Sequence, residues 1–135
     1  MAKYKGYLLK VKDQIFPMKY IKSETYTSTD NQRSELKAYR NTNNDLIRQT
    51  SPNFKTKIEF ETPPLLQSQY EEIRQLLNQG TINRTERKIK ITYWNSEDLT
   101  YKNAVVYMPD ISYTIKNQMR NELLYNPLKM EFIEY

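Results

Sequence analysis

Residues 53–62 have the sequence NFKTKIEFET, the clearest alternation of apolar and charged residues in the chain. Phe54, Thr56, Ile58 and Phe60 fall on one side of an extended strand, and lysine and glutamate alternate on the other. Alternation with a period of two predicts a strand with one face in the core and one face in water. The stretch therefore favours a fold built on β-sheet.

A helix is predicted directly after this strand. Pro63 and Pro64 end the alternation, and Ser68 with Glu71 three positions later has the spacing of a capping box. Apolar residues then recur at helical spacing, at Tyr70, Ile73, Leu76 and Leu77. We expect one amphipathic helix over about residues 68–79, with Gly80 as its C-terminal cap.

Further strands are expected in the sequence both before this strand and after this helix. Residues 4–12 and 14–21 suggest an opening strand pair, with Pro17 at an edge or bulge. Two hairpins are predicted, one from 35–40 and 46–50 around the turn 41–45, and one from 87–94 and 99–108 around 95–98. Alternation resumes at 111–115, a polar loop follows around 117–121, and 123–135 closes the chain as a last strand.

The pattern predicts a single domain over residues 1–135, with about eight strands and one flanking helix. Such a chain forms a β-sandwich or a partly open barrel. Residues 22–33 are almost entirely polar and are expected to form a loop, and the N-terminal residues could form an arm that crosses to a neighbour.

Composition removes a large share of known enzyme mechanisms. The chain has no cysteine and no histidine, which excludes thiol nucleophiles, histidine acid/base catalysis and the usual zinc sites. With two glycines it has no glycine-rich phosphate loop. The remaining carboxylate pairs, Glu59 with Glu61 and Glu71 with Glu72, fit a solvated strand face and the first turn of a helix. We therefore expect no catalytic residues, cofactor or metal, and no membrane span.

Tyrosine and basic residues point to binding surfaces. The chain has 12 tyrosines, a residue that suits surfaces buried only on assembly, because its ring is apolar and its hydroxyl tolerates water. Lysine and arginine number 21 against 16 acidic residues, a modest excess. One alternative is a barrel that binds single-stranded nucleic acid. Its candidate contacts are Lys55, Lys57, Arg84, Arg87, Lys88, Tyr93 and Trp94, although Tyr93 lies on the predicted core face with Ile89 and Ile91.

From about residue 35 onward several short motifs follow one another in order. They are YRNTNNDLIR at 39–48, KTKIE at 55–59, PPL at 63–65, ITYW at 91–94, VYMPD at 106–110 and MEFIEY at 130–135. Through the order of these motifs, rather than through any one of them, the chain resembles small tail proteins of long-tailed phages and prophages of Gram-positive bacteria. Those proteins usually carry glycine where this chain has Asn44, and asparagine can adopt the same left-handed geometry.

The resemblance implies a tail-tube or distal-tail protein with a β-sandwich and a flanking helix. It implies a ring of six copies that contact one another and neighbouring tail proteins, with DNA only as passing cargo. The expected location is the tail of a virion, assembled in the cytoplasm of the bacterial host. The candidate interface residues are Tyr26, Tyr39, Arg40, Asn41, Asn44 and Arg48.

Overall fold

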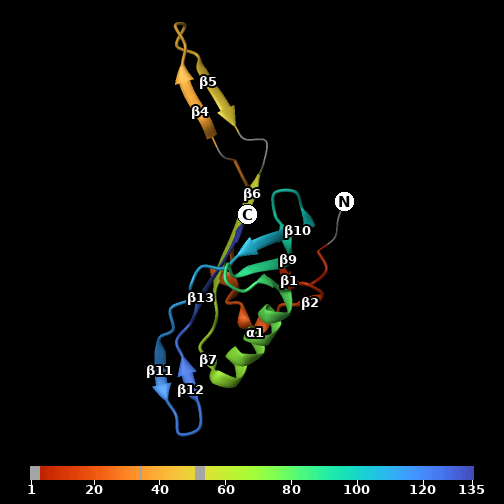
Figure 1. Cartoon of the computed structure of the whole chain (residues 1–135), viewed down its shortest axis with the longest axis vertical. Helices are drawn as coiled ribbons and strands as arrows, with labels where there is room; N and C mark the ends of the chain where they lie inside the picture. Colours follow the sequence, from red (N-terminus) through yellow and green to blue (C-terminus); the bar gives the residue numbers. More distant parts are fainter. Residues whose placement is uncertain (1–3, 34, 51–53) are drawn as a thin grey trace.

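An eight-stranded antiparallel sheet forms the body of the chain in the computed structural model, which describes residues 4–33, 35–50 and 54–135 (Figure 1). Its strands follow the order β2-β1-β9-β10-β13-β6-β3, and β8 also pairs with β9. The bounds are β1 Leu9–Val11, β2 Gln14–Ile15, β3 Thr27–Gln32, β6 Lys55–Glu61, β8 Thr81–Asn83, β9 Lys88–Asn95, β10 Thr100–Tyr107 and β13 Lys129–Glu134.

Two smaller sheets extend from this body. Strands β11 (Ile115–Gln118), β12 (Leu123–Tyr125) and β7 (Leu65–Leu66) form a three-stranded sheet. Strands β4 (Glu35–Arg40) and β5 (Leu46–Thr50) form a hairpin of their own. Figure 1 shows the two ends of the long axis of the molecule occupied by this hairpin and by β11–β12. The observed hairpin has the predicted strand bounds.

Alternation places the core on one face of the large sheet. Thr56, Ile58 and Phe60 of β6 are buried as predicted, whereas Phe54 lies before the strand and is exposed. Residue 53 of that predicted strand lies outside the described residues. Buried positions also alternate in β9, β10 and β13. These three strands lie side by side in the sheet, and β13 pairs with β6. The core is therefore a continuous layer across these strands.

Helix α1 (Gln67–Gly80) covers this layer with Ile73, Leu76 and Leu77. The predicted helix is confirmed, but its first turn differs in detail. The Gln69 side-chain oxygen accepts a hydrogen bond from the Leu66 backbone N–H at 3.0 Å, so Leu66 rather than Ser68 precedes the helix. Ser68 instead donates to Glu122 at 3.2 Å.

Gly80 is the last residue of α1, and its role differs from the predicted cap. It does not have the left-handed backbone of a glycine cap, and Thr81 ends the helix by donating its hydroxyl to the Leu77 carbonyl at 2.9 Å. A Cβ at Gly80 would lie 2.4 Å from Cγ1 of Val11. Glycine therefore allows the end of α1 to approach β1 closely.

The large sheet curves strongly. Thr56 of β6 and Tyr93 of β9 share a hydrogen bond of 2.8 Å, although β10 and β13 lie between their strands. In a flat sheet strands three places apart would lie about 14 Å apart, since neighbours are spaced at roughly 4.8 Å. The edge strand β3 also reaches the β9–β10 turn, where Asn95 donates to Asn31 at 3.1 Å. The mostly β fold with one flanking helix is thus confirmed, and this curvature gives it the form of a partly open barrel.

The first differences between the predicted and the observed elements lie in the N-terminal third of the chain. Residues 22–33 do not form one polar loop, because 23–25 form a 3₁₀ turn and β3 pairs with β6. The strand predicted over 14–21 ends at Ile15, since Pro17 leads into the 3₁₀ turn Met18–Tyr20 rather than lying in a strand. The proline ring fixes φ at a value that suits such a turn.

The C-terminal third also differs from the prediction. Residues 111–114 are not in a strand, and the expected loop at 117–121 is partly taken up by β11. The final predicted strand is divided into β12 and β13, which belong to different sheets. Pro127 lies at the break, and proline has no N–H to continue a ladder.

Candidate assembly surfaces

The hairpin β4–β5, residues 35–50 and called the arm below, stands away from the body of the molecule (Figure 1). Every residue of β4 is exposed to solvent. Three large apolar side chains of the arm are exposed, Leu36 to 69%, Leu46 to 52% and Tyr39 to 47%. An isolated two-stranded hairpin is marginally stable in water, so this geometry is typical of a segment that is covered in an assembly.

The tip of the arm is held by asparagine. The side-chain oxygen of Asn41 accepts hydrogen bonds from the backbone N–H groups of Asn43 at 2.9 Å and Asp45 at 3.0 Å. Asn44 has a φ of 64°, the left-handed conformation expected from the sequence. Arg40 donates to the Asn44 carbonyl at 3.0 Å. Five of the six candidate interface residues therefore lie together on the arm, as Tyr39, Arg40, Asn41, Asn44 and Arg48.

The two faces of the arm have a basic and aromatic character. Tyr39 pairs with Ile47 across the strands, and the Lys37 ammonium lies 5.1 Å from the centre of the Tyr39 ring. On the strands' other side Arg48 forms an ion pair with Glu35 at 2.5 Å. Such surfaces combine apolar contact with charge, as protein interfaces do.

The root of the arm is fastened to the β9–β10 turn. Arg33 donates to Glu97 at 2.8 Å, and its guanidinium lies 5.1 Å from the centre of the Phe54 ring. Asn31 donates to Asp98 at 3.0 Å. The bond from Arg33 lowers the pKa of Glu97, and the bonds from Lys102 and Asn31 lower the pKa of Asp98. These contacts connect the end of β3, where the arm begins, to the β9–β10 turn of the same sheet.

Tyr26 does not belong to this surface. Its ring stacks on Phe60 with the ring centres 5.9 Å apart, and its buried hydroxyl has no hydrogen-bond partner among the described residues. Burial raises the pKa of that hydroxyl. Tyr26, the sixth candidate interface residue, is therefore half-buried and packs against the core rather than lying on the arm.

The candidate nucleic-acid contacts do not form one surface, because the two aromatic residues lie apart from the basic ones. Tyr93 is 3% exposed and points into the core, so its ring is unavailable to a base. Trp94 lies six positions from Lys88 along β9, about 20 Å at roughly 3.3 Å per residue. Its indole packs edge-on against Tyr101 at 5.1 Å. Among the remaining candidates, Lys57 pairs with Glu59, Lys55 lies at the start of β6, and Arg84 and Arg87 lie in the β8–β9 turn.

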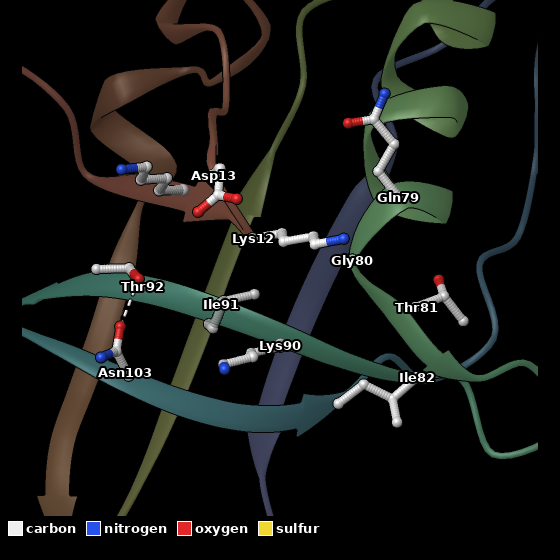
Figure 2. Close-up of a pocket in the computed structure, with 11 residues that line it drawn as sticks. Lys12, Asp13, Gln79, Gly80, Thr81, Ile82, Lys90, Ile91, Thr92 and Asn103 are labelled. Atoms are coloured by element: carbon white, nitrogen blue, oxygen red, sulfur yellow. Dashed lines mark hydrogen bonds between the residues drawn. The ribbon is translucent and has the colours of Figure 1, made fainter.

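A groove on the outer face of the sheet is lined by three lysines. Lys10, Lys12 and Lys90 line it with Asp13 and a Thr92–Asn103 hydrogen bond of 2.6 Å, around a volume of about 550 Å³ (Figure 2). In Figure 2 the Lys12 side chain extends toward Gly80 at the end of α1, where a cation stabilises the helix dipole. With one carboxylate among its lining residues, the groove suits an anionic group better than acid/base chemistry.

A second, smaller groove lies between β2 and α1 and is called the β2–α1 groove below. It has a volume of about 200 Å³. Tyr20 in this groove donates its hydroxyl to Glu72 at 2.6 Å, and burial together with Glu72 raises the pKa of Tyr20 to about 12. Its lining residues are Gln14, Ile15, Pro17, Tyr20, Glu72, Ile73, Gln75, Leu76 and Gln79.

Within the described ranges no three acidic, histidine or cysteine side chains come together as metal ligands. None of the helices in those ranges is long and apolar enough to span a membrane. The candidate binding features of the described residues are the arm and the two grooves.

A family model described as "Family of unknown function (DUF6711)" matches residues 1–135. The chain belongs to this family. No curated protein matches the DUF6711 chain in sequence.

Two solved structures share the fold of this DUF6711 chain. One is a chain from the tail of an empty gene transfer agent particle, determined by helical refinement with C6 symmetry. The other is a chain from the virion of a native gene transfer agent particle. Each is 11% identical with a TM-score of 0.56, and the match covers 100% of the DUF6711 chain and 95% of the other chain. The likeness supports the mostly β fold over the whole length.

Sequence reasoning missed both grooves of the DUF6711 chain. The β2–α1 groove joins residues 14–20 to residues 72–79, which are distant in sequence and share no motif. The lysine groove joins β1, β9 and the end of α1 in the same way. The lysines at alternate positions of β9, Lys88 and Lys90, are a sequence signal for the basic outer face.

Proposed function

We propose that this chain is a non-enzymatic structural subunit of a phage-like tail, which assembles with copies of itself into a ring. The arm is the observation that carries the proposal, because exposed Leu36, Tyr39 and Leu46 gain burial only through a neighbour. The shared fold with chains of gene transfer agent tails and virions supports the same role.

The ring has six copies in this proposal, in keeping with the C6 symmetry of the similar tail chain. It lies in the tail tube or the distal tail of a long-tailed phage of Gram-positive bacteria, next to other tail proteins, with DNA only as passing cargo. The subunit folds in the host cytoplasm and ends in the virion. A ring closes by a head-to-tail contact, so each copy needs two different complementary surfaces.

The test is the molar mass of the purified protein by light scattering over a concentration series, with negative-stain images of the same samples. The mass is expected to rise to that of a closed ring, and the images to show rings or tubes. Replacement of residues 35–50 by a short Gly-Ser linker is expected to give a folded monomer, because none of the described core residues lies in the arm. A wild-type chain that stays monomeric at every concentration would contradict the proposal.

A further inference from the structure

The arm and the β2–α1 groove lie at opposite edges of the same sheet. The large sheet begins with β2 and ends with β3, and the arm follows β3 in the chain. Among the described strands β2 pairs with β1 alone, so its outer side keeps unpaired backbone groups. Exposed strand edges of this kind add strands from other chains.

The groove beside β2 has an apolar floor and one charge. Ile73 and Leu76 of α1 are buried beneath it, while Ile15 is 54% and neighbouring Met18 50% exposed at its edge. Among the described residues that line the groove, only Glu72 is charged. One oxygen of that carboxylate accepts the Tyr20 hydroxyl, and the other can accept a further donor.

The arm offers the matching chemistry. Its exposed apolar side chains fit the floor and edge of the groove, and its cations, Lys37, Arg40 and Arg48, outnumber its carboxylates, Glu35 and Asp45. A basic, partly apolar hairpin thus faces a groove whose single charge is negative. The lysine groove makes a poor alternative for the arm, because three lysines line it.

The arm of a given copy does not reach its own groove. Figure 1 shows the arm leaving the body at one end of the long axis, while β2 and α1 lie on the body itself. Only another copy can bring the two together. A contact between one edge of one copy and the opposite edge of the next is the head-to-tail arrangement from which a ring closes.

We propose that the β2–α1 groove of each copy receives the arm of a neighbouring copy, whose β4–β5 hairpin lies along the free edge of β2. This inference rests on the proposed self-assembly and names its two surfaces. The contact covers Ile15 and Met18 together with Tyr39, and places Lys37, which lies on the Tyr39 face of the arm, beside Glu72.

The chain has no cysteine, so single introduced cysteines report the contact without background. Tyr39→Cys protein is mixed with Ile15→Cys protein under assembling conditions and treated with a short bismaleimide. The expected product is a cross-linked dimer formed only in the mixture. A chain carrying both substitutions is expected to give a ladder of cross-linked species that ends at the closed ring.

The matched control is Ile82→Cys, which is as exposed as Ile15 but lies outside the β2–α1 groove. Mixtures of Tyr39→Cys with Ile82→Cys are expected to give no dimer. Assemblies that form while the Ile15 mixture gives no more dimer than the control would overturn this inference and leave the proposed function intact. Failure of the unmodified chain to assemble would overturn both.

Discussion

The side-chain amide of Asn95 in β9 donates a hydrogen bond of 3.1 Å to the side-chain oxygen of Asn31 in β3, near the root of the arm. Both residues are buried, and Asn95 also accepts bonds from the backbone N–H groups of Glu97 and Asp98 at 3.1 Å. One asparagine therefore shapes the β9–β10 turn and fixes the edge strand to it. The position of the arm depends on this contact between Asn95 and Asn31, which is called the joint below.

Asn95→Ala is expected to destabilise the chain by about 2–3 kcal/mol, because it leaves buried donors and acceptors unpaired. The measurement is the midpoint of urea unfolding. Asn103→Ala, at an exposed position of neighbouring β10, is the control and is expected to change the free energy of unfolding by less than about 0.5 kcal/mol. Equal effects of the two substitutions would show that the joint contributes no stability.

The close approach of Gly80 to Val11 predicts a second effect on stability. Gly80→Ala places a Cβ against Cγ1 of a fully buried valine, and overpacking of this kind costs about 1–3 kcal/mol. Val11→Ala makes room, so the double variant should lose less stability than the two single losses added together. Additive losses in thermal or urea unfolding would rule out the steric explanation.

The tip of the arm could be predicted closely from the sequence, and the reason is local. Asn41 to Asp45 supply turn residues between two alternating stretches, so the bounds of β4 and β5 follow from nearest neighbours. Strand β3 was missed for the opposite reason. Its sequence, TSTDNQ, has no apolar residue, and only pairing with β6 makes it a strand.

The same distinction between local and long-range contacts decides which candidate surfaces the sequence can predict. The arm carries its candidate residues in one short stretch, so sequence reasoning found them together. The β2–α1 groove is made by the packing of α1 beside an edge strand, and the lysine groove by four strands and a helix end. No spacing in the sequence encodes such contacts, because they depend on tertiary structure.

Asn44 at the tip of the arm predicts a test of backbone geometry. Asn44→Gly is expected to keep the arm and its assembly, because glycine adopts a φ of 64° without strain. Asn44→Val is expected to disorder the tip, since a β-branched residue is strained by about 1–2 kcal/mol there. Amide exchange at Asn43 and Asp45 measures the effect, and equal exchange rates in both variants would contradict it.

Alkaline pH tests the Tyr20–Glu72 contact in the β2–α1 groove. Burial and the Glu72 carboxylate raise the pKa of Tyr20 from 10.0 to about 12. The unfolded chain therefore loses this proton first, so the stabilising contribution is complete below pH 10 and is lost as the pH rises toward 12. Urea midpoints measured between pH 9 and pH 12 should fall less steeply for Tyr20→Phe than for the unmodified chain. Half-buried Tyr26 and Tyr70 also have raised pKa values and contribute to the remaining slope in both proteins. Parallel slopes would therefore mean that the Tyr20 hydroxyl titrates as it does in the unfolded chain.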